Sequence, residues 1–423
     1  MIITRIKAIN FYGIKDPMEV IFTEGGEKEK VGYVNIKKER VSLISGFYGA
    51  NASGKSTVLN LIDTVVRIML SRQEEFMITP NGIKQETVIS LPNYHSNMKT
   101  NPIVMEIDFI IDNDKYNYLI SIINEGKEIS EEVLYKNSKK IFSRKDHCIS
   151  FEKSLEKKIG ALVKNIVAPK KSSFLSVILD ESSDIAVFAN LKNEIGISEL
   201  NQMKNKFCFI TDKRSVQMGQ NNINGLMAFA INYLNDIKTQ DEKLATVNSI
   251  VKYFEPSFES LVIKKEGDNN PINKSFSFTY EAKYSNFYKN LSVTELSAGT
   301  RELIAYMGDV LRIIKSGGIV IYDEISKYYH PDMEIAILNL FKDKDINKHN
   351  AQIFFSSHSH ETFDLLQNDQ AHILEKKDGN ISVSKVSDYD VKERDNIKRI
   401  YRLGSLGGVP DTIDFNRIIN NLL

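Results

Sequence analysis

The feature that most constrains this chain is a run of small residues that separates two apolar segments. Residues 41–47, VSLISGF, predict a short buried strand, and the apolar spacing that follows residue 55 predicts a helix. Between the two, residues 49–56 fit the pattern G-x-x-x-x-G-K-[ST]. In such a loop the backbone N–H groups surround phosphate groups, and the lysine reaches the terminal phosphates of a nucleotide. The strand before the loop and the helix after it favour this interpretation over an ordinary glycine turn.

Length and composition limit the class of protein further. The 423 residues include 55 basic and 55 acidic residues, and 42% are hydrophobic, which is enough for two or three lobes with apolar cores. The net charge of zero provides no overall attraction to nucleic acid, so DNA contact would need a local patch. Cys148 and Cys208 have neither metal-ligand nor disulfide spacing, which fits a reducing cytoplasm. No apolar run approaches the roughly 20 residues of a membrane span.

The apolar patterns divide the chain into three segments. Residues 1–153 predict two N-terminal strands, the phosphate loop with its helix, a polar irregular stretch at 73–100 and an antiparallel meander from residue 102 onward. Residues 154–253 carry apolar residues at helical spacing and predict a helical insert. Residues 254–423 begin with strands and then alternate helix and strand, as in a parallel sheet. One parallel sheet is therefore predicted to start near the phosphate loop and to finish near the C-terminus.

Two carboxylates follow a predicted buried strand in the third segment. Residues 319–322, IVIY, lead directly into Asp323 and Glu324. A carboxylate at the tip of a parallel strand beside a phosphate loop is placed to hold Mg²⁺, and a second carboxylate next to it can polarise the attacking water. A solvated loop is the alternative for Asp-Glu after a strand, but the phosphate loop in the same chain favours the metal and water roles.

A second predicted anion site precedes that strand by one helix. The segment 296–300, LSAGT, comes before a helix predicted to begin near Arg301. Ser297 offers a hydroxyl and Gly299 a bare backbone N–H at a helix N-terminus, where an anion is favoured. The alternative is an ordinary helix cap formed by Ser297 or Thr300. The position, one helix ahead of the carboxylate strand, favours the anion site.

The order of these motifs resembles the ABC-type ATPase heads of the SMC and RecF kind. Those heads have a phosphate loop, a long interruption, an LSGGQ-like signature, an apolar strand that ends in Asp-Glu, and a switch segment. Here the signature is LSAGT, with Ala298 and Thr300 as departures at tolerant positions, and the switch segment is FFSSHS. The resemblance implies an α/β fold, namely an ABC-type P-loop ATPase head with an antiparallel β subdomain and a helical insert.

The motif after Glu324 narrows the resemblance. Transporter-type ABC proteins would have Asp where His330 stands, whereas "DE…HP" is similar to the DExxxxLHP pattern of the OLD-like ATPases and the bacterial AAA ATPases grouped with them. Tyr329 replaces the usual Leu. Many members lie in phage-defence operons, such as the RloA- and AbiL-like proteins and the ATPase of the PARIS system, usually beside a separate effector. The C-terminal run RLGSLGGVPDTIDF also resembles this group, and no mechanism follows from it.

The resemblance implies ATP and Mg²⁺ as ligands and assigns roles to residues. Lys55 contacts the β- and γ-phosphates, Thr57 the α-phosphate, and Ser56 and Asp323 the Mg²⁺, while Glu324 orients or deprotonates water. His358 senses the γ-phosphate, with His360 as the alternative, and the Ser-Ser-His-Ser string after an apolar strand favours a site over a core histidine. The signature would cap ATP bound to another subunit, in a head-to-head dimer or a larger assembly. The predicted nucleotide-binding residues are Gly49, Asn51, Ala52, Ser53, Gly54, Lys55, Ser56, Thr57, Ser297 and Gly299.

Three functions are compatible with these residues. The first is a cytoplasmic ATP-hydrolysing sensor and scaffold that controls a separate effector protein, encoded by a neighbouring gene, in antiphage defence. The second is a RecF- or SMC-like DNA-repair ATPase that acts directly on DNA, and the lack of a basic stripe counts against it. The third is a self-contained nuclease with its site in the helical insert, where the carboxylates are scattered. About 65 residues follow His358, which is too short for the nuclease domain of the OLD proteins.

Overall fold

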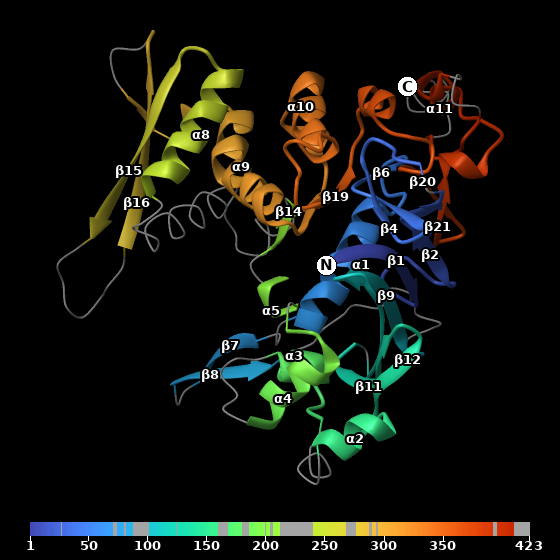
Figure 1. Ribbon diagram of the computed structural model, residues 1–423. Coiled ribbons are helices and arrows are strands. Elements are labelled where there is room, and N and C mark those ends of the chain that lie inside the picture. The colour runs from blue at the N-terminus through green and yellow to red at the C-terminus, as the bar shows by residue number, and fades with distance from the viewer. Residues whose placement is uncertain are drawn as a thin grey trace, which may run out of the picture.

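The computed structural model describes most of the chain. The described residues are 1–423 without 27, 71–73, 80–81, 88–100, 125, 160–167, 180–185, 199, 204–205, 212–239, 268–275, 287–289, 293–294, 392–395 and 410–423. Figure 1 shows two sheets, one above the other, with a separate β-hairpin and helix at one side. The mixed α/β architecture with an antiparallel subdomain confirms the predicted fold class.

The upper sheet is the parallel sheet that the sequence predicts. Its order is β14-β18-β19-β6-β20-β21, and only the last pair, β20 with β21, is antiparallel. The strand before the phosphate loop therefore lies beside two strands from the far end of the sequence, which confirms that one sheet is built from both halves of the chain. The strands are β6 (Ile44–Tyr48), β14 (Phe207–Ile210), β18 (Ile319–Tyr322), β19 (Gln352–Ser356), β20 (Ala371–Lys377) and β21 (Asn380–Lys385).

The two faces of this sheet are buried in two different cores. Along β18, Ile319 and Ile321 pack with helix α1 and the antiparallel sheet, whereas Val320 and Tyr322 pack with α9 and α10. Alternate side chains of a strand point to opposite faces, so a strand covered on both sides reads as a continuous apolar run. The helices are α1 (Lys55–Leu70), α9 (Ala298–Ser316), α10 (Pro331–Lys342) and α11 (Ile397–Arg402), with short 3-10 turns η4 (Ile325–Lys327), η5 (His360–Leu365) and η6 (Val386–Asp388).

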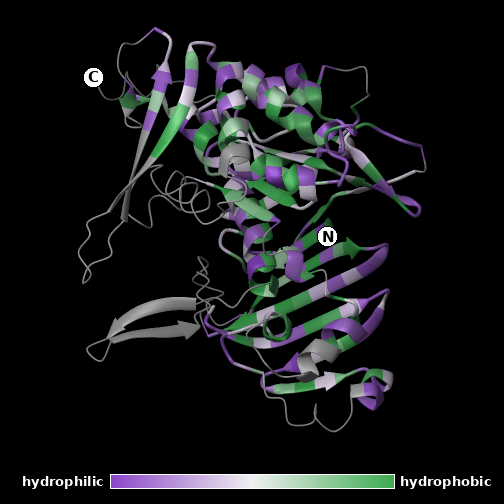
Figure 2. Ribbon diagram, turned by 60° about the vertical axis from the view of Figure 1, so that its left-hand side comes forward, coloured by the Kyte–Doolittle hydropathy of each residue, from purple (hydrophilic) through white to green (hydrophobic). Residues whose placement is uncertain are grey.

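The lower sheet is antiparallel and confirms the predicted meander. Its order is β13-β12-β11-β10-β9-β1-β2, so the N-terminal strand pairs with both β2 and β9. One face of β9 to β11 packs against α1, and Figure 2 shows the alternation of hydrophobic and hydrophilic residues along these strands. The strands are β1 (Ile2–Ile9), β2 (Met18–Ile21), β9 (Ile103–Ile111), β10 (Asp114–Ile123), β11 (Glu128–Lys136), β12 (Lys139–Lys145) and β13 (Cys148–Phe151).

The remaining strands form smaller sheets. Some lie in a stretch predicted to be irregular, and others lie in stretches predicted to be strands. The stretch 73–100 is not wholly irregular, because it contains the antiparallel pair β7–β8. The predicted strands after residue 254 are confirmed as β15 and β16. These strands are β3 (Thr23–Gly25), β4 (Tyr33–Ile36), β5 (Glu39–Ser42), β7 (Glu74–Thr79), β8 (Gly82–Thr87), β15 (Phe258–Gly267), β16 (Phe276–Tyr284) and β17 (Leu291–Ser292).

The predicted helical insert contains helices and also one strand of the parallel sheet. Strand β14 pairs with β18 from Phe207↔Ile319 to Ile210↔Tyr322, so this part of the segment belongs to the sheet. Residues 212–239, which include part of the predicted helical pattern, lie outside the described residues. The three-segment division of the chain stays a prediction. The helices are α2 (Lys153–Ile159), α3 (Phe174–Ile178), α4 (Ala186–Ile195), α5 (Leu200–Met203) and α8 (Gln240–Phe254).

Helix length and polarity bear on membrane insertion. Within the described parts of the chain, no helix is both long enough and apolar enough to cross a bilayer.

Candidate functional site

The phosphate loop has the backbone conformation of an anion cradle. Gly49, Ala52 and Gly54 have φ values of 152°, 62° and 109°. Residues with a side chain adopt such positive φ values only at an energetic cost, whereas glycine adopts them freely. Alternation of ordinary and left-handed residues turns successive N–H groups toward one concave side. A Cβ on Gly49 would lie 2.6 Å from the Leu374 carbonyl oxygen, and one on Gly54 would lie 2.5 Å from Ile381 Cδ1. Both glycines are therefore required by close packing as well as by conformation.

Lys55 places a positive charge inside this loop. Its side chain is buried, and Nζ donates to the carbonyl oxygens of Gly49 at 2.8 Å and Ala50 at 3.0 Å. Burial lowers the pKa of Lys55, while the nearby charges of Glu324 and Asp323 act in the opposite direction. Among the described residues, Nζ hydrogen-bonds to these two neutral carbonyl groups and forms no salt bridge, which suits a bound polyphosphate.

The predicted carboxylates lie at the end of β18, next to the phosphate loop. Asp323 donates its backbone N–H to the Ile210 carbonyl at 2.9 Å, so the tip of β18 is anchored to β14. The Ser356 hydroxyl at the tip of β19 donates to Asp323 Oδ1 at 2.7 Å and accepts the Glu324 backbone N–H at 2.7 Å. Glu324 has a left-handed backbone, with φ 56° and ψ 50°, which turns the chain sharply at the catalytic position predicted for it.

The switch histidine lines the cavity at the phosphate loop. Its backbone N–H donates to Ser326 Oγ at 3.0 Å. The pKa of His358 is lowered by burial and by the Lys55 charge, against an opposing effect of Asp323. His358 is therefore neutral at pH 7 and close to the same charged groups as the phosphate loop. The cavity has a volume of about 460 Å³ and is lined by Tyr48, Gly49, Ala50, Asn51, Ser357, His358, His360, Tyr401 and Val409.

Five of the lining residues were not among the predicted site residues, namely Tyr48, Ala50, Ser357, Tyr401 and Val409. Tyr401 and Val409 belong to the C-terminal segment, whose resemblance to related sequences provided no mechanism. Ser356 was also missed as a residue that positions the carboxylates. The Ser-Ser-His-Ser string at 356–359 indicated this region, but the sequence does not show which hydroxyl contacts the end of the neighbouring strand β18. His360, the alternative to His358, lines the same cavity, so the structure does not separate the two histidines by position.

The signature segment forms a helix cap and lies apart from the cavity lining. Ser297 is the N-cap of α9, and its Oγ accepts the Thr300 backbone N–H at 3.1 Å. The helix begins at Ala298, three residues before the predicted start. A Cβ on Gly299 would lie 2.8 Å from the Tyr328 carbonyl oxygen, so the glycine lets the cap pack against the loop that follows Glu324. Of the described residues that line the cavity, none belongs to 296–300.

The donor set beside the phosphate loop fits Mg²⁺. Ser56 at the start of α1 and Asp323 at the tip of β18 offer the hard oxygen ligands that this ion prefers. The described residues contain no cluster of three or more His, Cys, Asp or Glu side chains that could enclose a metal. A site that uses one hydroxyl, one carboxylate and the oxygens of the nucleotide needs no such cluster. The buried Ser53 hydroxyl, which has no hydrogen-bond partner, is a further polar group in the loop.

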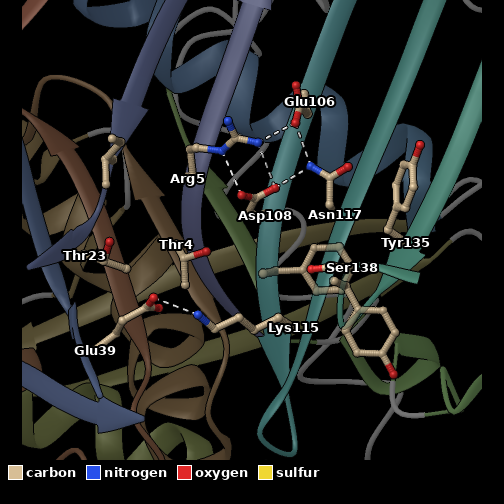
Figure 3. Close-up of a pocket in the computed structure, with 13 residues that line it drawn as sticks. Thr4, Arg5, Thr23, Glu39, Glu106, Asp108, Lys115, Asn117, Tyr135 and Ser138 are labelled. Atoms are coloured by element: carbon tan, nitrogen blue, oxygen red, sulfur yellow. Dashed lines mark hydrogen bonds and ion pairs between the residues drawn. The ribbon is translucent and has the colours of Figure 1, made fainter. Parts of the chain in front are cut away.

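A second cavity, of about 480 Å³, lies on the outer face of the antiparallel sheet (Figure 3). Arg5 donates to Asp108 Oδ2 at 2.8 Å and also forms an ion pair with Glu106. Lys115 Nζ lies 2.7 Å from Glu39 Oε1. These charges satisfy one another across the strands, so this cavity provides no uncompensated group of the kind that Lys55 provides.

The fold and the site together define the class of protein. A phosphate loop between β6 and α1, an Asp-Glu pair at the end of β18 and His358 after the intervening strand β19, all on one parallel sheet with an added antiparallel sheet, make this chain an ABC-like AAA ATPase. The family model described as "AAA domain, putative AbiEii toxin, Type IV TA system" matches residues 44–364. The chain belongs to that family.

Solved structures of similar architecture are SMC head domains. The head domain from Thermotoga maritima has a TM-score of 0.41 and 11% identity, over 91% of this chain and 99% of that one. The Pyrococcus furiosus Smc head domain with an extended coiled coil, bound to the C-terminal domain of ScpA, has a TM-score of 0.40 and 14% identity, over 96% and 99%. The Pyrococcus yayanosii head domain has a TM-score of 0.41 and 11% identity, over 91% and 97%. No curated protein sequence matches this chain.

Proposed function

We propose that this protein binds and hydrolyses Mg²⁺-ATP and that two copies enclose the nucleotide between the phosphate loop of one and the signature segment of the other. The resulting switch controls a separate effector protein in antiphage defence, in the cytoplasm. The observation that carries the proposal is the convergence of Lys55, Asp323 and His358 on one phosphate cradle. Lys55 begins the helix after β6, Asp323 follows β18 and His358 follows β19, and each has a distinct task in phosphoryl transfer.

The chemistry follows from charge and position. Lys55 and the loop N–H groups bind the β- and γ-phosphates, and α1 directs its N-terminus at them. A magnesium ion held by Ser56 and Asp323 would supply charge neutralisation when bound. Glu324 lies next to Asp323, where a carboxylate accepts a proton from, or orients, the attacking water. Neutral His358 donates one N–H to the γ-phosphate. Little covalent chemistry is asked of the protein, because positioned charges provide most of the catalysis.

The dimer is supported by where the signature lies. Ser297 and Gly299 sit at the N-terminus of a 19-residue helix but outside the lining of the chain's own nucleotide cavity. A second copy would bring the same segment to the open side of that cavity. ATP then bridges two subunits, and loss of the γ-phosphate removes the bridge.

The effector part of the proposal draws on the family. The family description names a "putative AbiEii toxin, Type IV TA system". The OLD-like and bacterial AAA ATPases that this chain resembles often lie in phage-defence operons, usually beside a separate effector. In the described part of this chain, no group of three or more His, Cys, Asp or Glu side chains is placed to hold a metal ion. We therefore assign the chain to the sensing and switching role and the toxic activity to its partner.

One experiment tests both parts. The full-length wild type, Glu324→Gln and Lys55→Ala are co-expressed with the small protein encoded by the neighbouring gene and purified by a tag on the ATPase. Glu324→Gln should bind ATP, lose turnover by about a thousandfold and accumulate as dimers, because only the water-activating group is lost. Lys55→Ala should lose ATP binding, turnover and ATP-dependent dimers together. Turnover and dimerisation are measured by phosphate release and light scattering.

Binding of the neighbouring protein is measured in the same preparations. ATP-dependent retention or release of the neighbouring protein, different between Glu324→Gln and Lys55→Ala, supports control of an effector. Wild-type turnover in Glu324→Gln would contradict the role of Glu324. Salt-sensitive binding of duplex DNA by the ATPase without any partner would instead favour direct action on DNA.

A further inference from the structure

The last described segment of the chain lies against the phosphate loop. Tyr401 at the end of α11 and Val409 beyond it line the same cavity as Gly49 and His358. The cavity wall therefore combines residues near both ends of the matched range 44–364, such as Gly49 and His358, with residue 409, which lies outside that range. The proposed roles of the phosphate loop and the switch histidine do not account for this segment.

The segment reaches the phosphate loop through a glycine turn. Gly404, Gly407 and Gly408 have φ values of 78°, 70° and 69°, in the left-handed region that favours glycine. A Cβ on Gly408 would lie 2.6 Å from Ile373 Cγ2 and 3.4 Å from the Cα of Gly49. The turn therefore packs backbone against backbone on the first glycine of the phosphate loop, and a side chain at Gly408 would push on that contact.

Hydrogen bonds hold this turn in place. The Tyr401 hydroxyl donates to the Gly408 carbonyl at 3.1 Å, and the Gly408 N–H donates to Glu375 Oε1 at 3.3 Å. The Tyr401 ring packs on Phe363, with ring centroids 5.0 Å apart, and lies 5.4 Å from the ring of His360. Burial raises the pKa of Tyr401 to about 12, so the hydroxyl remains a donor at neutral pH. The turn is thus fixed to β20 on one side and to the switch segment on the other.

We propose that residues 407–409 of this turn are a component of the nucleotide site, where they support Gly49 in its phosphate-binding conformation and close the cavity at Val409. The ligand is the nucleoside triphosphate of the proposed function, on which this inference rests. Because the turn and the phosphate loop share a backbone contact, ATP affinity depends on the turn. By linkage, bound ATP holds the turn in place.

Two glycine substitutions separate this role from ordinary loss of stability. Gly408→Ala and Gly404→Ala both place a Cβ at a left-handed position, so the conformational penalty is similar. Among the described residues, the Gly404 Cβ would meet only Val409 Cγ2, at 3.7 Å. The Gly408 Cβ would lie 2.6 Å from Ile373 Cγ2 and 3.3 Å from the Leu374 carbonyl oxygen, beside the Cα of Gly49 at 3.4 Å. The full-length proteins are titrated calorimetrically with a non-hydrolysable ATP analogue and Mg²⁺. Gly408→Ala should weaken the Kd by about tenfold and Gly404→Ala by less than about twofold.

A milder variant keeps the test valid if Gly408→Ala does not fold. Tyr401→Phe retains the ring packing and loses only the hydroxyl that donates to Gly408, so the Kd should weaken by about fivefold with little change in melting temperature. Equal Kd values for wild type, Tyr401→Phe and Gly408→Ala would overturn the role of the turn while the proposed function stands. Equal weakening by Gly404→Ala and Gly408→Ala would overturn it too. A wild type that binds no ATP would overturn both.

Discussion

Ser356 lies where the strand of the carboxylates meets the strand of the switch histidine. It is fully buried, and its single hydroxyl donates to the Asp323 carboxylate and accepts the N–H of Glu324. One hydroxyl therefore sets the orientation of both groups that the proposed reaction requires. Groups that orient a metal ligand contribute to activity without touching substrate, because they keep the ligand in the reactive geometry.

Ser356→Ala should lower ATP turnover by about tenfold to a hundredfold and leave the Kd for ATP within about threefold, because Lys55 and the loop N–H groups are untouched. Steady-state phosphate release and calorimetric titration measure the two quantities. Ser45→Ala is the matched control, since Ser45 is buried in the neighbouring strand β6 and its hydroxyl has no hydrogen-bond partner in the part of the chain that the structure describes. Equal turnover in the two variants would contradict the positioning role.

At the scale of elements, a buried carboxyl group joins the signature helix α9 to the strand β18. Glu302 is 4% exposed, and its Oε1 lies 3.3 Å from the Tyr322 hydroxyl, which is 3.0 Å from the Tyr329 hydroxyl. The second oxygen, Oε2, has no hydrogen-bond partner among the described residues. Burial raises the pKa of Glu302 to about 7, against a smaller opposing effect of the Tyr322 hydrogen bond. The helix and the strand are therefore held together by a carboxyl group that is protonated over much of the acid range.

This pKa shift has a definite sign for stability. Between about pH 4.5 and pH 7 the unfolded chain loses the Glu302 proton and the folded chain keeps it, so the free energy of unfolding falls as the pH rises through that window. The contribution is on the order of 3 kcal/mol over the whole window. Glu302→Gln should remove it, so the loss of stability between pH 5 and pH 8 becomes smaller than in the wild type. Urea denaturation at the two pH values measures the difference.

Other titrating groups contribute equally to the wild type and to Glu302→Gln, so their effects cancel when the pH dependence of the two proteins is compared. Glu334, whose pKa burial also raises to about 7, contributes with the same sign to wild type and variant alike. Replacement of the exposed Glu156 by Gln is the control and should leave the pH dependence unchanged. A variant Glu302→Gln with the full wild-type pH dependence would show that Glu302 is ionised in the folded protein.

At the scale of the whole molecule, the nucleotide cavity and the signature occupy different parts of one chain. The cavity is built by β6, the switch segment and the C-terminal segment, while the signature caps α9. In the dimer that we propose, a single subunit carries two incomplete halves of the site, and a second copy related by two-fold symmetry would complete both. In a single subunit, Ser297 caps helix α9. A variant that tests the dimer therefore has to keep this cap.

The substitutions Ser297→Asp and Ser297→Asn keep the cap of α9, because both side chains are good N-caps. Asp places a negative charge against the partner's γ-phosphate and should reduce turnover by about a hundredfold, whereas Asn should reduce it by less than about tenfold. Both should melt within a few degrees of the wild type. An equal mixture of Ser297→Asp and Lys55→Ala should regain roughly a quarter of wild-type turnover, because half of the dimers contain one intact site. A mixture as inactive as its components would contradict a site shared between subunits.

Local sequence determined the phosphate loop, the Asp-Glu pair, the switch segment and the alternating meander, because each depends on backbone and side-chain preferences within a few neighbouring residues. Tertiary structure decided which segments meet. The four apolar residues Phe207–Ile210 suit a buried helix as well as a strand, and only the exposed edge of β18 selects the strand. Likewise, Ser356 and the turn at Gly408 acquire partners more than 30 residues away, and such contacts follow from burial of the whole sheet rather than from local spacing.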